Sequence, residues 1–227
     1  MSWYDLISPL YDIGSAGSGK ARREAVAQLR LSPGDTVLDL ACGTGLNFPY
    51  IQEGIGEQGL LIGLDYSSGM LAKARRKAQR RGWENVRLIQ ADAGTLSADL
   101  LKEKAGVGRV DKLICTLGLT VIPEWELAFE HAWALLKPGG RCAVMDWWLE
   151  RRNLFARFLE FISHGEVGRR CWVPLEEKST DYSYSTFIRG MVFVAGGSAP
   201  EAVTSEHREE CAVPANGIER KEVLHDN

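Results

Sequence analysis

The sequence lacks the features that mark several large classes of protein. Its five cysteines form no CxxC pair and no Cys/His spacing, and their odd number argues against a disulfide framework. No apolar run approaches the roughly 20 residues of a membrane-spanning helix, and no charged-then-apolar leader opens the chain. We therefore expect reduced thiols, no metal site, a cytoplasmic location and at most a peripheral contact with a membrane.

An excess of basic residues is also missing. The formal net charge is −3, so the overall balance demands no nucleic-acid partner. The 45% hydrophobic and 25% charged content is ordinary for a globular protein, and 227 residues suffice for one domain with a full core. We expect one domain over residues 1–200 and, because the composition then turns polar and acidic, a disordered tail over residues 201–227.

The chain is organised around residues 37–47, VLDLACGTGLN. The apolar opening predicts a buried strand, and Gly43 and Gly45 then permit a tight turn that a ligand can approach closely. The third glycine of the dinucleotide-binding pattern is absent, because Phe48 stands in its place. This absence argues against NAD, whereas an acid in the first strand, Asp39, suits a ligand that carries an ammonium group and no phosphate.

Two further predicted strands lead to acids. Residues 60–64 end at Asp65, which lies 20 residues beyond Gly45. At that spacing a strand-end carboxylate can accept both hydroxyls of a ribose. Residues 86–89 lead to Asp92, which is placed to accept a hydrogen bond from an adenine amine. The three strand ends together predict a site for an adenosine-containing ligand.

These segments resemble the motifs of class I S-adenosylmethionine-dependent methyltransferases. DLACGTG at 39–45 resembles the first motif, LDYSSGML at 64–71 the second and QADA at 90–93 the third, while LLKPGG at 135–140 resembles a late helix-to-strand turn. The resemblance implies an α/β fold, a Rossmann-like seven-stranded and mostly parallel sheet with helices on both faces and an antiparallel C-terminal strand. It also implies S-adenosyl-L-methionine as the cofactor.

The resemblance assigns cofactor contacts to residues of these motifs. Asp39 helps to anchor the methionyl ammonium, directly or through water, while Asp65 binds the ribose and Asp92 the adenine. The other expected contacts come from the glycine turn, from the neighbours of the two later acids and from the end of the fourth strand: Ala41, Gly43, Gly45, Tyr66, Met70, Ala93, Cys115 and Thr116.

The remaining pattern predicts alternating helices and strands. Further helices are expected at residues 20–31, 46–54, 68–81, 97–105, 123–136 and 151–164, and further strands at 110–115, 141–147, 184–188 and 191–195. The last two strands predict a terminal hairpin. The helix at 68–81 carries a basic cluster, Lys73, Arg75, Arg76, Lys77, Arg80 and Arg81. Such a cluster is usually a solvated face, and attraction to anionic lipid is the alternative.

Two apolar segments bear on the methyl acceptor. The helix at 151–164 has one broad apolar face, which predicts either a core helix or a surface for an acyl chain or a bilayer. Residues 1–19 are aromatic and apolar and then glycine-rich, which predicts a lid over the ligand. Tyr11 lies there in a YD pair that similar ubiquinone-biosynthesis and phospholipid N-methyltransferases share, and it is the candidate catalytic residue.

Methyl transfer from a sulfonium is an in-line displacement, which needs positioning rather than a nucleophile–base triad. The apolar segments favour an amphipathic acceptor. The resemblance to ubiquinone/menaquinone-type and to phospholipid or betaine-lipid N-methyltransferases makes a lipid head-group amine the leading hypothesis. Two alternatives stay open. One is methylation of a quinone or other small molecule on carbon or oxygen, and the other is a non-catalytic regulatory module that binds S-adenosylmethionine.

Overall fold

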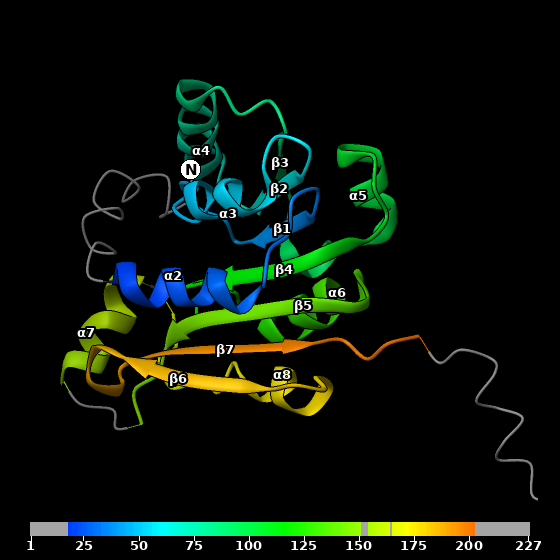
Figure 1. Cartoon of the computed structure of the whole chain (residues 1–227). Coiled ribbons are helices and arrows are strands. Elements are labelled where there is room, and N and C mark those ends of the chain that lie inside the picture. The colour runs from blue at the N-terminus through cyan, green and yellow to red at the C-terminus, as the bar shows by residue number, and fades with distance from the viewer. Residues whose placement is uncertain (1–17, 151–153, 164, 203–227) are drawn as a thin grey trace, which may run out of the picture.

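The computed structural model describes residues 18–150, 154–163 and 165–202. Tyr11, almost all of the predicted lid and residues 203–227 of the predicted tail lie outside these ranges. The described chain forms a seven-stranded sheet in the order β3-β2-β1-β4-β5-β7-β6 (Figure 1). The strands are β1 Thr36–Leu40, β2 Leu60–Asp65, β3 Val86–Gln90, β4 Val110–Thr116, β5 Leu136–Trp147, β6 Ser183–Phe187 and β7 Val192–Ser198.

The sheet is mostly parallel, as predicted. Strands β1 to β5 run parallel, whereas β7 pairs antiparallel with β5 and β6 pairs antiparallel with β7. Strand β1 lies between β2 and β4, so the strand order reverses there. Ligands of open α/β sheets bind in the crevice beyond the carboxyl ends of the strands at such a reversal. The predicted site motifs follow β1, β2, β3 and β4, and they therefore meet at this edge.

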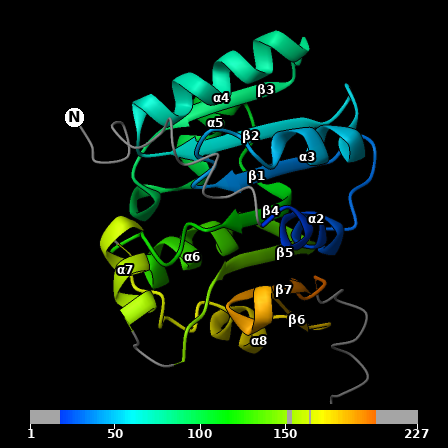
Figure 2. The ribbon, with the colours of Figure 1, turned by 90° about the vertical axis from the view of Figure 1, so that its left-hand side faces the viewer.

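Helices cover both faces of the sheet. They are α2 Gly19–Gln28, α3 Phe48–Ile55, α4 Ser68–Arg81, α5 Ala98–Ala105, α6 Trp125–Ala134, α7 Leu154–Ser163 and α8 Val173–Lys178, with 3₁₀ turns η2 Ala93–Thr95 and η3 Ile188–Gly190. Figure 1 shows α2 in front of the sheet and α6 behind it. Figure 2 shows α7 beyond the carboxyl ends of the parallel strands. None of the helices in the described ranges combines the length and the apolarity that crossing a bilayer requires.

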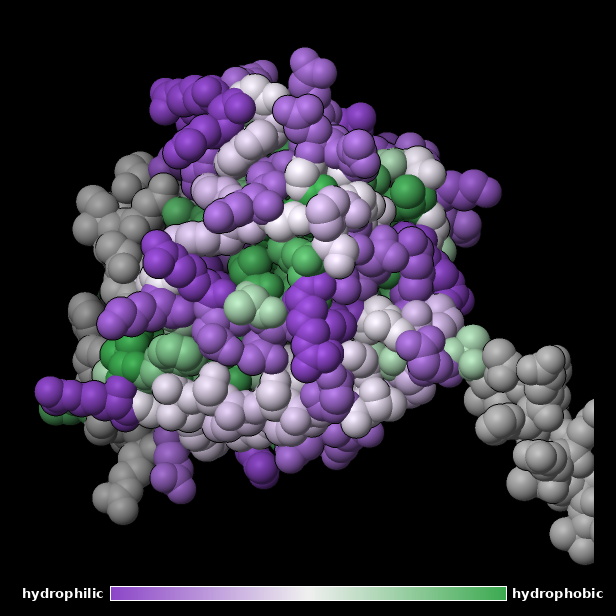
Figure 3. Space-filling model, in the orientation of Figure 1, coloured by the Kyte–Doolittle hydropathy of each residue, from purple (hydrophilic) through white to green (hydrophobic). Residues whose placement is uncertain are grey.

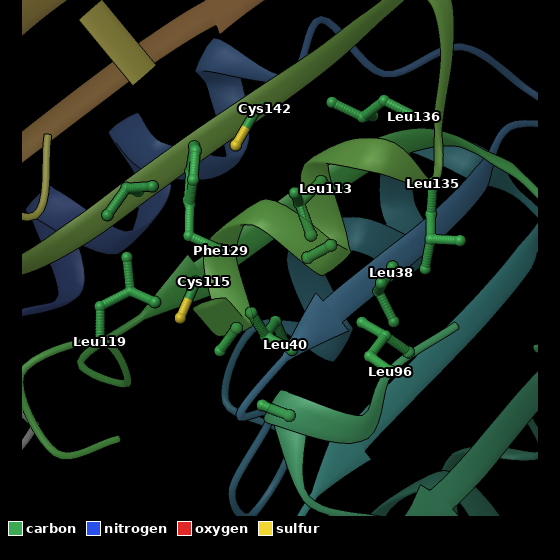
Figure 4. Packing of buried hydrophobic residues seen from close by; sticks show 14 of the residues in the cluster. Leu38, Leu40, Leu96, Leu113, Cys115, Leu119, Phe129, Leu135, Leu136 and Cys142 are labelled. Carbon is green, nitrogen blue, oxygen red and sulfur yellow. The ribbon is translucent and has the colours of Figure 1, made fainter. Parts of the chain in front are cut away.

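Strand β1 contributes to a core on each side of the sheet. Leu38 and Leu40 belong to the cluster that α5, α6 and α8 complete, whereas Val37 belongs to the cluster of α2, α3 and α4. Figure 4 shows the first cluster, in which Leu113 and Phe129 share the interior with the β1 leucines. Burial on both faces is what an apolar parallel strand predicts. The carboxyl end of β1, and with it the glycine turn, is therefore held by packing from two sides.

Helix α4 has the predicted bounds because both of its ends are marked in the sequence. The Ser67 hydroxyl accepts a hydrogen bond from the Met70 backbone N–H, and Gly82 closes the helix in the left-handed conformation. One predicted boundary was wrong, and one helix was missed. Strand β5 begins at Leu136 rather than at residue 141, with a register shift against β4 that accommodates the Pro138 turn. Helix α8 was not predicted, because six residues are too short for a clear period.

Candidate functional site

The turn after β1 has an unusual backbone. Ala41, Gly43 and Gly45 have φ angles of 55°, 56° and 73°, in the left-handed region that favours glycine. A Cβ at Gly45 would lie 2.7 Å from the Phe48 ring, whereas nothing lies within 4 Å of a Cβ at Gly43. Packing against the following helix thus requires the glycine at 45. The backbone at Gly43 is open to close approach by a ligand.

Replacing Gly45 by alanine should destabilise the protein by about 2–4 kcal/mol, because the left-handed backbone and the clash with Phe48 both oppose a side chain. Gly106→Ala is the matched control. Gly106 ends α5 with φ 79°, and a Cβ at this position would meet no atom within 4 Å, so only the cost of the left-handed backbone, about 1–2 kcal/mol, should remain. Chemical denaturation of both variants measures the difference. Equal losses of stability in the two variants would show that the Phe48 ring moves away from the new side chain at no cost.

Asp65 connects the first two strand ends. One carboxylate oxygen accepts a hydrogen bond from the Gly43 N–H at 2.8 Å, and the other accepts one from the Ser67 N–H at 2.9 Å. Each carboxylate oxygen has a further lone pair, so the group can still accept hydroxyl donors. Tyr66 follows with 68% of its surface exposed, while Met70 is buried in the first turn of α4. The residues predicted to contact the ribose and adenine are therefore adjacent in space.

Asp92 ends the third strand segment on the exposed side of the site. Its Oδ1 accepts a hydrogen bond from the Gly94 N–H at 2.8 Å and caps the η2 turn, in which Ala93 is buried. The side-chain amide of Gln90 donates to the Tyr66 carbonyl at 3.3 Å. This bond joins the second and third strand ends. The carboxylate of Asp92 remains accessible beside them.

A buried polar network lies beneath the glycine turn. Asp39 is fully buried and accepts hydrogen bonds from the Asn47 amide at 2.9 and 3.1 Å. The Arg22 guanidinium donates to the Asn47 Oδ1 at 2.6 Å and to the Thr116 hydroxyl at 2.8 Å. The Asn47 amide also donates to Thr116 at 3.0 Å. Helix α2, the glycine turn and the end of β4 are thus joined around one buried acid and one buried base.

Burial dominates the ionisation of this network. It raises the pKa of Asp39 to about 7, against the opposing effects of the Asn47 hydrogen bond and the Arg22 charge. Burial also raises the pKa of the Cys42 and Cys115 thiols well above the ordinary range. These two cysteines are therefore packing residues rather than nucleophiles.

Asp146, at the carboxyl end of β5, is a second buried acid that the sequence analysis did not identify. It accepts hydrogen bonds from the Thr120 hydroxyl at 2.6 Å, from the Thr120 N–H at 3.1 Å and from the Trp147 N–H at 2.8 Å. On the other side of the same loop, Glu166 N–H donates to the Thr120 carbonyl and Arg169 donates to the Leu119 carbonyl. Asp146 is thus a positioning residue for the loop that follows β4.

Burial raises the pKa of Asp146 to about 6. The folded protein therefore holds a proton that the unfolded chain releases near pH 4, and the free energy of unfolding should fall as the pH rises from about 4 to about 6. Asp146→Asn should remove this contribution, on the order of 3 kcal/mol. Asp39, whose pKa is about 7, should supply the pH dependence that remains. Denaturation from pH 4 to 8 tests this, and an unchanged slope would contradict it.

The structure brings together the predicted residues that it describes. They lie at the carboxyl edge of the sheet, around the ends of β1 and β4. They are the glycine turn, the acids Asp39, Asp65 and Asp92 with their neighbours, and Cys115 and Thr116 at the end of β4, which pairs with β1. Sequence reasoning missed Arg22, Asn47 and Asp146. Asn47 is the last residue of the segment 37–47, so its polar side chain beside the glycine turn could have been recognised as a candidate site residue. Arg22 gives no local signal, because an arginine in a predicted helix is usually solvated.

Known proteins are similar to the part of the chain that forms this edge of the sheet. Residues 31–186 match the family described as "Methyltransferase domain". A demethylmenaquinone methyltransferase of Listeria welshimeri is 32% identical over 148 residues, which are 63% of this chain and 60% of that protein. The chain thus spans only about half to three fifths of the length of the curated relatives it matches.

Solved structures share the fold at low sequence identity. An S-adenosylmethionine-dependent methyltransferase from Aquifex aeolicus aligns with a TM-score of 0.55 and 19% identity, over 78% of this chain and 89% of that one. The [4+2]-cyclase SpnF aligns with a TM-score of 0.67 and 15% identity, over 88% of this chain and 94% of that one. The cyclase shows that the fold alone does not fix the reaction.

The open backbone at Gly43 and the accessible strand-end acids Asp65 and Asp92 fit an adenosine-containing cofactor. The family match covers β1 to β5 and therefore includes every one of these positions. The chain belongs to the class I S-adenosylmethionine-dependent methyltransferases, and S-adenosyl-L-methionine is its cofactor.

Proposed function

We propose that this enzyme methylates a quinone-type ring acceptor. The observation that carries the proposal is the similarity to demethylmenaquinone methyltransferases, which reaches 30% identity over 125 residues and 32% over 148 residues in two of them. The similarity favours the quinone alternative over the lipid head-group amine, which was the leading hypothesis from the sequence and has no support among these relatives. A peripheral membrane contact fits an apolar acceptor and remains a prediction.

The residue roles are part of the proposal. Asp65 accepts the ribose hydroxyls, Tyr66 and Met70 flank the adenine, and Asp92 accepts from the adenine amine beside the Ala93 N–H. The methionine end faces the glycine turn, including Ala41, Gly43 and Gly45, and the backbone of Cys115 and Thr116. The bound cofactor supplies an electrophilic methyl group, and the chain supplies the geometry in which an acceptor atom is held in line with it.

The buried pair at the methionine end suits a zwitterion. A methionyl group carries one ammonium and one carboxylate, and Asp39 and Arg22 offer the complementary charges within one hydrogen-bonded network. We therefore extend the proposed cofactor contacts to Arg22, which the sequence analysis did not include. Asp39 acts through Asn47 or through water, because its own carboxylate is fully buried.

The proposed acceptor must act as a nucleophile toward the methyl carbon. A ring carbon becomes nucleophilic when the ring is reduced to its hydroxylated form, and transfer then forms a carbon–carbon bond, breaks the carbon–sulfur bond and releases the ring proton to solvent. Asp146 is not the base for this step, since it is fully buried and its oxygens are occupied by Thr120 and Trp147. Tyr11 keeps its predicted role on the acceptor side.

The test is methyl transfer from labelled S-adenosylmethionine by the full chain. One reaction contains a short-chain demethylated naphthoquinone with dithionite, a second contains the same compound without reductant, and a third contains phosphatidylethanolamine vesicles. Label in the reduced naphthoquinone alone is the expected result. Label in the phospholipid would restore the head-group amine hypothesis, and cofactor binding without transfer to any acceptor would favour the regulatory module.

A further inference from the structure

Helix α4 presents a basic stripe, defined here as Lys73, Arg76, Lys77, Arg80 and Arg81. These residues are spaced i, i+3, i+4, i+7 and i+8, so they share one side of the helix. With Thr44 of the glycine turn they line a surface hollow of about 480 Å³. A different side of the helix packs on the sheet through the buried residues Met70, Leu71, Ala74 and Ala78.

Four of the five cations of the stripe have no acidic partner among the residues that the structure describes. They are Lys73, Arg76, Arg80 and Arg81. Lys77 donates to the Gly45 carbonyl at 3.0 Å. Like charges at i, i+4 destabilise a helix, so the stripe opposes the stability of α4. The stripe is a positively charged surface on a chain whose formal net charge is −3.

We propose that the basic stripe docks the protein on the surface of an anionic lipid bilayer. The first argument is charge complementarity. Each Lys or Arg that lies near an anionic membrane strengthens binding roughly fivefold. The hollow is lined by five long basic side chains and Thr44, and several separate cations suit a layer of phosphate head groups better than one tightly held ion.

A bilayer fits the lining of the hollow and the exposed apolar side chains elsewhere on the chain better than RNA does. Single-stranded RNA is held by cations together with aromatic rings on which bases stack, and the side chains that line the hollow include no aromatic ring. Two apolar side chains of α7, Leu154 and Phe161, are 85% and 74% exposed. They are seven residues apart and share a helix face. Apolar groups of this kind can insert among lipids and have no use in binding a phosphate backbone.

The position of the stripe links it to the site. Thr44 belongs to the turn that follows β1, and α4 begins directly after the carboxyl end of β2. Helix α7 follows β5, whose carboxyl end lies at the same edge of the parallel sheet. Figure 3 shows a strongly hydrophilic surface at the top of the molecule, where α4 lies in Figure 1. Docking would bring the acceptor side close to the layer in which an apolar quinone dissolves.

The choice of a bilayer rests in part on the proposed quinone acceptor, so the test contains no acceptor and measures no methyl transfer. The full chain is sedimented with vesicles of phosphatidylcholine alone or with 30% phosphatidylglycerol. Binding is expected only to the anionic vesicles, with a loss at 0.5 M salt, because screening shortens the reach of exposed charges. Arg76→Gln/Arg80→Gln/Arg81→Gln should weaken this binding on the order of 100-fold.

A matched control neutralises three cations away from the stripe, with Arg75→Gln/Lys102→Gln/Lys104→Gln. It should lower vesicle binding at most severalfold, and circular dichroism should show both triple variants folded. Equal losses in the two variants would overturn the proposal, since net charge alone would then explain binding. Inorganic phosphate at 10 mM and a 20-nucleotide RNA are added as competitors. Displacement from vesicles by phosphate, or tighter binding to the RNA than to the vesicles, would also overturn it.

Discussion

Replacing Asp65 by alanine should weaken the binding of S-adenosylmethionine by about 1–3 kcal/mol, roughly 5- to 150-fold in the dissociation constant. The change removes an acceptor that the proposed function assigns to the ribose hydroxyls. It also removes the acceptor for the Gly43 and Ser67 N–H groups, so the glycine turn loses a tie to the second strand. Titration calorimetry with the cofactor on the full chain measures the loss.

Two further variants separate these effects. Asp65→Asn keeps one carbonyl oxygen, so it should lose less affinity than the alanine variant. Asp99→Ala removes an exposed acid in the first turn of α5 and should leave affinity within twofold. An unchanged affinity in Asp65→Ala would remove this residue from the site. A loss matched by an equal loss in Asp99→Ala would show that only the overall charge matters.

The parallel half of the fold was predictable because each of its signals is local. A buried strand, a glycine turn and a strand-end acid can each be read from adjacent residues, and parallel strands place their carboxyl ends at one edge. Gly45 illustrates this, since the turn that needs it and the Phe48 ring that excludes a side chain are only three positions apart. The predicted site residues therefore meet in space without any knowledge of long-range packing.

The missed residues depend on contacts between distant parts of the chain. Arg22 reaches Thr116 across 94 positions, and Asp146 reaches Thr120 across 26. Nothing in the local sequence marks an arginine of an amphipathic helix as buried, because such residues are usually solvated. The same reasoning applies to the stripe on α4, where the sequence pattern was evident but the contact of Lys77 with the glycine turn was not.

The acceptor is the part of the function that the fold leaves open. A cyclase shares the architecture with a TM-score of 0.67, so the sheet and the cofactor motifs do not by themselves decide what reacts. In this chain Asp146 and Arg169 fix the loop after β4 that contains Leu119 and Thr120. The proposed cofactor contacts are supported by the residues at the strand ends. The proposed acceptor is supported only by the similarity to demethylmenaquinone methyltransferases.

Arg22→Met should have the largest effect on the buried network. The variant leaves Asn47 and Thr116 without their charged donor and removes the larger of the two positive charges that compensate Asp39, which then keeps only Lys77. The expected loss of unfolding free energy is on the order of 3 kcal/mol. Binding of S-adenosylmethionine should weaken at least tenfold if the guanidinium faces the methionine carboxylate. Arg23→Met, an exposed neighbour on the same helix, is the matched control and should change neither quantity much.

The double variant Arg22→Met/Asp39→Asn separates folding from binding. Removing both charges eliminates the uncompensated buried acid, so stability should recover by about 1–3 kcal/mol relative to Arg22→Met. Affinity for the cofactor should not recover, because both groups proposed to complement the methionyl zwitterion are then absent. If affinity returned together with stability, Arg22 would act only by holding the glycine turn in place. A stable double variant with weak cofactor binding would instead make the buried pair part of the cofactor site.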